Sequence, residues 1–289
     1  MTRSSIAGSV RSTDDRLALA TEPIRRRRGG GGGPVTASPL ASGRTADVYA
    51  LDGDRVLRRY RSGGDVRAEA DLMRHLHAHS YPVPGVHHAD GPDLVLDRVT
   101  GPTLVEASVS GVVEVGAAAR LLVDLHDRLH ALPALRSTGP GTRILHLDLH
   151  PLNVLLAADG PVVIDWANAA EGPPELDRAM TAVILAEVAV DRSHPLSALA
   201  GDLLMAYLAE IGPVVALDPA VALRADTGTL DVGLLPEAAA LVRSVTARIR
   251  PPLPAARVQA GGGAAPWTVW GVGPAGTGAA ARRTPGGAR

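Results

Sequence analysis

The segment 144–153 contains three polar side chains whose types and spacing suit phosphoryl transfer. His146, Asp148 and Asn153 fit the pattern His-x-Asp-x-x-x-x-Asn, in which the carboxylate can orient an attacking hydroxyl and accept its proton. A further carboxylate, Asp165, follows two apolar runs that come after Asn153 in the sequence. Amide and carboxylate oxygens are the ligands that Mg²⁺, a hard cation, prefers. The sequence therefore predicts Asp148 as a base, with Asn153 and Asp165 as metal ligands.

The elements around these residues must bring them together. Val154–Leu156 and Val162–Ile164 are apolar runs on either side of an Asp-Gly turn, which predicts a β-hairpin. The hairpin joins Asn153, before its first strand, to Asp165, after its second. An ordinary hairpin with polar ends is the alternative, and a lone His-x-Asp would favour it. Three polar positions at the required spacing favour a functional site instead.

The composition excludes several other classes of function. The chain has 289 residues, 46% of them apolar, and no cysteine, so disulfides, thiolate metal sites and cysteine catalysis are excluded. A net charge of −1 offers no electrostatic case for a nucleic-acid partner. No apolar run approaches the roughly 20 residues that span a bilayer, and the N-terminus lacks the apolar stretch of a secretory signal. We therefore expect a cytoplasmic protein without membrane or nucleic-acid partners.

The chain divides into an ordered centre and two tails. Residues 1–36 are rich in Arg and Gly and residues 251–289 in Pro, Gly and Ala, and both are expected to be disordered because neither buries enough apolar area to offset its ordering entropy. Between them, residues 37–98 predict a small β-rich lobe with one helix, and residues 99–250 a larger, mostly helical lobe. This α+β arrangement is that of a bilobal, protein kinase-like fold with a nucleotide in the cleft between the lobes. The predicted strands are 46–51, 55–60, 86–88 and 93–99, and the predicted helices are 66–79, 117–132, 175–190, 195–211 and 236–249.

Longer segments around these residues carry a family resemblance. They are Glu69–Leu76, Pro82-Val-Pro84, the loop 146–153, Val162-Val-Ile-Asp165-Trp166-Ala-Asn168 and Glu175-Leu-Asp177-Arg-Ala. Together they resemble the aminoglycoside phosphotransferase and choline kinase-like family, over about residues 37–250. The resemblance implies ATP or GTP as phosphoryl donor, Mg²⁺, and a hydroxyl acceptor on a small molecule. It also implies that Asp148 is the base, that Asn153 and Asp165 bind metal, and that His146 holds the loop by hydrogen bonds.

The chain lacks the lysine that kinase-like folds place on the third strand to hold the donor phosphates. All 29 basic residues are arginines, and Arg58 occupies the matching place, with Glu69 on the following helix as its expected partner. Alternation along the strand points Arg59 to the opposite face. Arginine keeps the charge and can bind phosphate through two donors, although it is not equivalent to lysine. Two exposed strand arginines are the alternative, but the partner glutamate favours a phosphate-binding role.

A phosphate loop and a hinge complete the predicted nucleotide site. The loop at Ser42, Gly43 and Thr45 has a single glycine and would bind phosphates through backbone amides helped by the two hydroxyls. The hinge, which includes Asp97 and Val99, would meet the nucleotide base through backbone groups. Its side chains favour neither ATP nor GTP.

Two other functions fit part of the pattern. A nucleotide-binding pseudokinase with a regulatory role is supported by the absent lysine and opposed by the complete set of Asp148, Asn153 and Asp165. A protein kinase is opposed by the lack of an Ala-Pro-Glu segment, and by the short distance from Asp165 to Asp177, which leaves little room for an activation loop. The first interpretation is therefore a Mg²⁺-dependent small-molecule phosphotransferase.

The remaining polar and aromatic residues favour structural roles. His75 and His79, like His126 and His130, are spaced as zinc ligands on a helix can be, but the accompanying acid is missing, so surface or helix-capping positions are expected. Trp166 is expected to pack. The carboxylates that follow Asp165 are dispersed, which argues against a polycationic acceptor. The aromatic residues are few, which argues against an aromatic cage for a choline-like cation. The sequence thus favours neither acceptor class.

Overall fold

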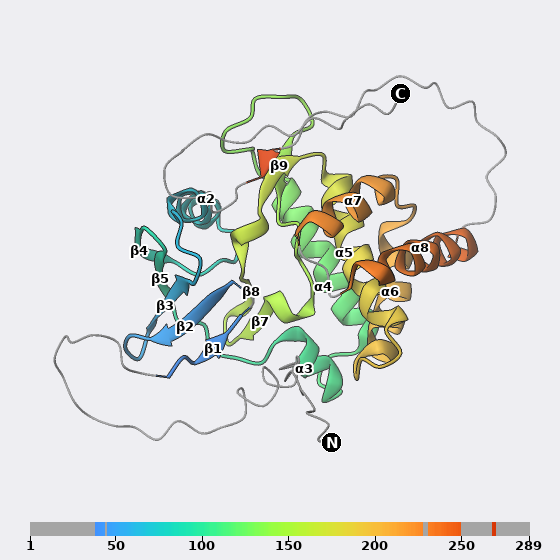
Figure 1. Cartoon of the computed structure of the whole chain (residues 1–289), viewed down its shortest axis with the longest axis horizontal. Coiled ribbons are helices and arrows are strands. Elements are labelled where there is room, and N and C mark those ends of the chain that lie inside the picture. The colour runs from blue at the N-terminus through green and yellow to red at the C-terminus, as the bar shows by residue number, and fades with distance from the viewer. Residues whose placement is uncertain (1–37, 44, 228–230, 250–267, 270–289) are drawn as a thin grey trace, which may run out of the picture.

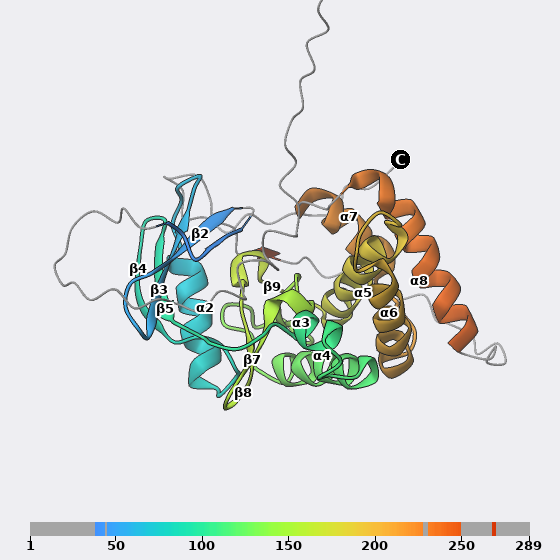
Figure 2. The same ribbon diagram turned by 90° about the horizontal axis from the view of Figure 1, so that it is seen from below.

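The computed structural model of the chain describes residues 38–43, 45–227, 231–249 and 268–269. A β-rich lobe with one helix comes first and a mostly helical lobe follows, so the predicted bilobal architecture is confirmed (Figure 1). Figure 2 shows the two lobes side by side from below. The expected disorder of residues 1–36 and 251–289 falls outside the described residues, apart from Thr268–Val269. No helix within the described ranges is long and apolar enough to span a membrane.

Five antiparallel strands and one helix make up the first lobe. Their bounds are β1 Ala41–Ser42, β2 Ala46–Ala50, β3 Arg55–Tyr60, α2 Arg67–Ala78, β4 Val86–Asp90 and β5 Asp93–Asp97. The sheet order is β1-β2-β3-β5-β4, which makes β3 the central strand. In this strand Arg58 lies opposite Val48 on one side and Leu94 on the other. Helix α2 buries Leu72 and Leu76 in the core, so its remaining face is left to solvent.

A short segment without regular structure joins the two lobes. β5 ends at Asp97, two residues earlier than predicted, because its partner strand begins at Arg55, which pairs with Asp97. Gly101 in the joining segment has a φ of 147°, and a Cβ there would lie 2.1 Å from the carbonyl oxygen of Leu156. Only glycine therefore allows the segment to lie this close to the following hairpin.

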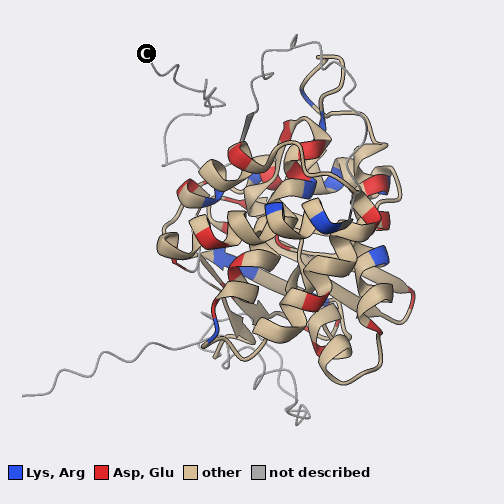
Figure 3. Ribbon diagram, turned by 90° about the vertical axis from the view of Figure 1, so that its right-hand side faces the viewer, with Lys and Arg blue, Asp and Glu red and all other residues tan. Residues whose placement is uncertain are grey.

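The second lobe contains most of the helices and two small sheets. The helices are α3 Leu104–Val109, α4 Val115–His130, α5 Pro174–Val190, α6 Ser197–Ile211, α7 Leu217–Thr227 and α8 Leu235–Ile249. The strands are β6 Arg143–Leu145, β7 Val154–Ala157, β8 Gly160–Val163, β9 Ala170–Gly172 and β10 Thr268–Val269. Helix α5 is buried almost throughout, and α4, α6, α7 and α8 pack around it. Figure 3 shows acidic and basic positions interspersed over this lobe.

Helices α3 and α7 have no counterpart among the predicted elements. α3 is six residues long and begins with a capping box, in which Thr103 and Glu106 bond each other's backbone N–H. α7 has apolar residues on all sides and a proline in its first turn. Neither has the amphipathic stripe that predicts a helix.

Candidate active site

The hairpin β7–β8 brings the candidate metal ligands together. Val154 pairs with Val163, so the residues just outside this pair meet at the open end of the hairpin. There the Ile164 N–H donates to the Asn153 carbonyl oxygen at 3.0 Å. Asp165 follows directly, so the structure places Asn153 and Asp165 on adjacent chain segments.

A buried carboxylate holds the candidate catalytic loop, residues 146–153, in an unusual backbone conformation. Leu147, just before Asp148, has a φ of 60°, and this left-handed region costs a non-glycine residue roughly 1–2 kcal/mol. Asp177, in the first turn of α5, accepts the N–H of Leu147 at 2.7 Å and that of His146 at 3.0 Å. Hydrogen bonds to a charged acceptor are about twice as strong as neutral ones. Asp177 therefore offsets the strain and fixes the direction in which Asp148 leaves the loop.

Two buried histidines of α4 surround Asp177. His130 Nε2 lies 2.9 Å and His126 Nε2 3.8 Å from Asp177 Oδ2. The predicted surface or capping position of His126 and His130 is therefore wrong, because the pair lies on the face of α4 that packs against α5 and α6. In the other pair, His79 is exposed at the C-cap of α2, as predicted, and His75 is half-buried. Burial alone would raise the pKa of Asp177, but the two histidines and the backbone N–H donors hold it well below its usual range. Burial lowers the pKa of His126 to about 3, so this ring is neutral near pH 7.

His146 connects the catalytic loop to the hairpin. Its Nδ1 accepts the Asp148 N–H at 3.2 Å, so the proton is on Nε2, which donates to the Ile164 carbonyl oxygen at 3.1 Å. Burial lowers the pKa of His146, which favours this neutral form. Trp166 is fully buried and packs on the imidazole with ring centroids 4.5 Å apart. His146 thus makes the loop-holding bonds expected of it, and the expected packing role of Trp166 is confirmed.

The Asp148 carboxylate is held by three neighbours. Asn153 Nδ2 donates to the Asp148 carbonyl oxygen at 2.8 Å and lies 3.3 Å from Oδ2. Arg224 Nη1 lies 3.4 Å and His150 Nε2 3.7 Å from Oδ1. The guanidinium also donates through Nε to Glu187 at 2.6 Å. The Asp148 side chain is 13% exposed, so a small hydroxyl can still reach it.

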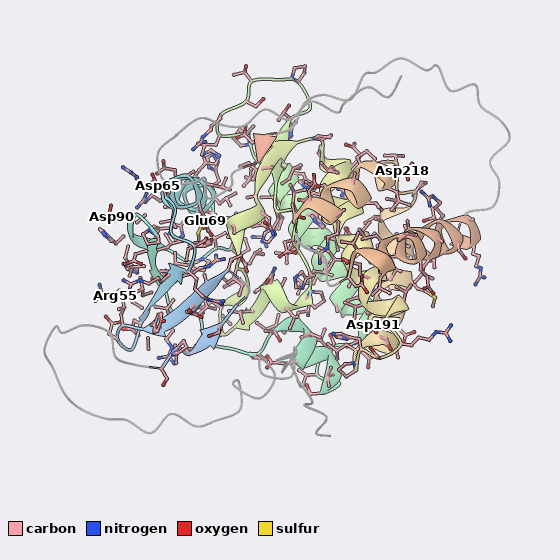
Figure 4. The ribbon with its side chains drawn as sticks, viewed as in Figure 1. Arg55, Asp65, Glu69, Asp90, Asp191 and Asp218 are labelled. Atoms are coloured by element: carbon pink, nitrogen blue, oxygen red, sulfur yellow. The ribbon has the colours of Figure 1, made fainter. Side chains whose placement is uncertain are left out.

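Arg58 links the two lobes. Its Nη1 donates to Glu69 Oε1 at 2.9 Å and its Nη2 to Asp165 Oδ1 at 2.5 Å. Figure 4 labels Glu69 on α2, on the side toward the centre of the molecule. Tyr60 Oη donates to the other Glu69 oxygen at 2.6 Å. Burial would lower the pKa of Arg58, but Asp165 and Glu69 raise it above its ordinary value, so the guanidinium stays charged. The predicted pairing with Glu69 is present, and Arg59 lies exposed on the opposite face.

The oxygens at the end of the hairpin suit a hard divalent cation. The Asp165 side chain is 35% exposed, so a ligand can reach it. Asn153 makes its hydrogen bonds through Nδ2, which leaves its amide oxygen as the ligand atom. Mg²⁺ is commonly held by one or two carboxylates together with water and substrate phosphates. The donor set therefore fits Mg²⁺ bound with a nucleotide. Among the described residues, no group of three or more His, Cys, Asp or Glu is arranged to hold a metal.

The predicted phosphate-loop residues lie in the turn between the first two strands. Ser42 ends β1, and the Gly43 N–H donates to the Ala46 carbonyl oxygen at 2.8 Å. Ser42 and Thr45 are exposed. Since Ala46 pairs with Tyr60 in β3, the turn lies at the end of the strand that carries Arg58. Phosphate binding by this turn stays a prediction.

The predicted hinge residues occupy the segment where the chain leaves the sheet. The Asp97 carboxylate accepts the Gly85 N–H at 2.8 Å and lies 2.6 Å from His87 Nε2, so it braces the start of β4. Val99 is half-buried in the joining segment. Contact of their backbone groups with a nucleotide base stays a prediction.

Four residues of the site were not predicted, and three of them, Arg224, Glu187 and Asp177, have little signal in the sequence. Arg224 and Glu187 come from two helices, α7 and α5, and meet only in the folded chain. Tyr60 is the same-face neighbour of Arg58 on β3, which alternation does indicate. Asp177 belongs to a segment that carries the family resemblance, but its contact with the loop 31 residues earlier is not readable from spacing.

The chain is similar to known phosphotransferases. The model of the phosphotransferase enzyme family matches residues 36–142 and 121–214, together more than half of the chain. Among solved structures, ADP-bound aminoglycoside phosphotransferase APH(2'')-Ib is 15% identical with a TM-score of 0.47, and the match covers 73% of this chain and 93% of that one. The gentamicin complex of APH(2")-IIa is 13% identical with a TM-score of 0.45, over 72% and 91% of the two chains.

A choline/ethanolamine kinase family protein from Mesorhizobium loti is 17% identical with a TM-score of 0.41, over 82% and 92% of the two chains. No curated protein matches the sequence. Because the family model spans more than half of the chain, the protein belongs to the phosphotransferase enzyme family.

Proposed function

We propose that the protein is an enzyme that transfers the γ-phosphate of ATP or GTP to a hydroxyl group of a small molecule. The observation that carries the proposal is the assembly of Asp148, Asn153, Asp165 and Arg58, which come from both lobes, around one end of the β7–β8 hairpin. Phosphoryl transfer depends on positioning and on charge stabilisation, and this set supplies both.

Each residue has a distinct role in the proposal. Asp148 orients the acceptor hydroxyl and takes its proton, because its carboxylate is fixed by Asn153 and open to solvent on one side. Arg58 binds the donor phosphates, and Glu69 holds it in place. Asn153 and Asp165 hold Mg²⁺, which when bound would neutralise the developing charge on the phosphate oxygens.

A regulatory pseudokinase is the second candidate, and the Arg58–Asp165 contact is the observation that favours it. A guanidinium 2.5 Å from a proposed metal ligand competes with the cation for the same carboxylate. The contact fits an active enzyme if the nucleotide phosphates draw Arg58 away from Asp165. It fits a pseudokinase if Arg58 takes the place of the metal.

The experiment that tests the proposal measures ADP and GDP release over a panel of small alcohols, with Mg²⁺ and with EDTA. We expect Mg²⁺-dependent release and a phosphate monoester as the product. Nucleotide binding that is equally tight in EDTA, with no product from any acceptor, would favour the pseudokinase.

A further inference from the structure

An apolar cavity lies beside the catalytic loop, on the side of the second lobe. Its walls come from α3, the end of the catalytic loop, α5 and the start of α6. They include Val105, Ile184, Val188 and Leu199. The cavity measures about 70 Å³, several times the roughly 10–15 Å³ that one water needs. It is therefore large enough for a short alkyl chain and too small for a drug-sized ligand.

His150 connects this cavity to the base. His150 is one of the residues that line the cavity, and its Nε2 lies 3.7 Å from Asp148 Oδ1 and 3.2 Å from Asn153 Nδ2. Pro151 and Leu152, the next two residues of the loop, line the cavity as well. His150 thus borders both the apolar space and the carboxylate that would orient the acceptor hydroxyl.

Three buried carboxylates of the second lobe are engaged in structural contacts. Glu171 accepts the backbone N–H groups of 135–137, Asp177 holds the catalytic loop, and Glu187 pairs with Arg224. Arg224 also places a positive charge 3.4 Å from Asp148. The residues lining the cavity, all within the described ranges, include no Asp or Glu. These features oppose a polycationic acceptor and favour an uncharged one.

We propose that the cavity binds the apolar part of the acceptor, and that the acceptor is a small alcohol with a short alkyl group. The hydroxyl faces Asp148 and the alkyl chain passes His150 into the cavity. This inference rests on the proposed function and names the substrate class for it. Burial of each methylene is expected to improve binding about fourfold, from the usual transfer free energy of a CH₂ group.

Binding is measured first, without nucleotide, by ¹⁹F NMR titration with 4-fluorobutan-1-ol and with 2-fluoroethanol. We expect the butanol to bind at least about tenfold more tightly, since it has two more methylenes. Ala200→Leu fills the cavity from α6, and Ser108→Leu fills it from α3. Each variant should abolish the difference in affinity between the two alcohols, so one of them suffices if the other fails to fold. Ala209→Leu, exposed on the same helix, is the matched control and should keep the difference.

Turnover is measured second, as ADP release with MgATP and butanol, ethanol or water alone as acceptor. We expect kcat/KM for butanol to exceed that for ethanol by about the ratio of the binding constants, and the filled variants to lose this excess while hydrolysis of ATP by water persists. Equal binding of both probes, or a preference that survives in the filled variants, would overturn the inference.

The two proposals fail in distinguishable ways. Transfer of phosphate to butanol and to ethanol with equal kcat/KM would refute the cavity as an acceptor site and leave the proposed phosphotransfer standing. Butanol binding in the cavity without ADP release under any condition would refute both the proposed function and the acceptor assignment.

Discussion

Replacing Arg58 tests whether the residue that stands in for lysine supports both the fold and the donor site. Arg58 is 9% exposed and Glu69 2% exposed, whereas the Asp165 side chain is 35% exposed. In Arg58→Ala, Glu69 keeps the Tyr60 hydroxyl as a donor but loses its cation. Removing one partner of a buried pair costs about 3–5 kcal/mol, and an exposed pair is worth about 0–1 kcal/mol. We therefore expect Arg58→Ala to lower the free energy of unfolding by about 3 kcal/mol, mainly through Glu69.

Urea denaturation followed by circular dichroism measures this loss. Arg59→Ala is the matched control, since Arg59 lies on the same strand with a partly exposed partner, Asp93, and should change stability by about 1 kcal/mol or less. Adding Glu69→Gln to Arg58→Ala removes the unpaired charge and should recover much of the loss.

The donor kinetics of the same variants test the functional role. Hydrogen bonds to charged groups contribute about 1.5–3 kcal/mol, so Arg58→Ala should lower kcat/KM for the nucleotide by about 10- to 100-fold, through both KM and kcat. Arg58→Lys should retain part of the activity. Equal effects of Arg58→Ala and Arg59→Ala on stability and on kinetics would refute the assignment of Arg58 as the buried, phosphate-binding residue of β3.

Three further predictions concern the metal, the loop and the buried histidine. Asp165→Ala should abolish Mg²⁺-dependent nucleotide binding, which calorimetric titration with MgATP measures, and unchanged affinity would remove Asp165 from that role. Asp177→Asn should cost about 3 kcal/mol in urea denaturation and slow turnover as well, because the loop N–H groups lose a charged acceptor; a stable, fully active variant would contradict this. The pKa of His126 is lowered by burial to about 3, so the unfolded chain binds the extra proton and stability falls as pH falls from 6.5 toward 3, by up to about 1.4 kcal/mol per pH unit. His126→Gln should flatten the unfolding free energy between pH 6.5 and 4 relative to the parent, and parallel curves would show that His126 does not cause the slope.

The two lobes and the β7–β8 hairpin could be predicted because the sequence patterns that indicate them are local. The loop 146–153 and the hairpin that follows depend on spacing within about 20 residues, where strand alternation and turn residues are informative. The pairing of Arg58 with Glu69 could be predicted for the same reason, because the two residues lie on a strand and on the helix that follows it. The boundary of β5 was less accurate because its partner strand determines it.

The contacts that complete the site depend on long-range packing. Arg224 reaches Asp148 across 76 residues and Arg58 reaches Asp165 across 107, and no local pattern encodes either contact. The buried position of His126 and His130 follows from the packing of α4 against its neighbours, which the i,i+4 spacing alone does not determine. A histidine pair on an apolar helix face fits burial as well as exposure.

Transfer of phosphate by the Asp148→Asn variant tests the central claim most directly. The substitution keeps the shape of the side chain and removes the base. With Mg²⁺, nucleotide and an acceptor alcohol, we expect the phosphate monoester seen by ³¹P NMR to form about 10²–10⁴-fold more slowly than in the parent, while nucleotide affinity and unfolding free energy stay close to the parental values. Product formation at the parental rate would contradict the assignment of Asp148 as the base, and the account of the site with it.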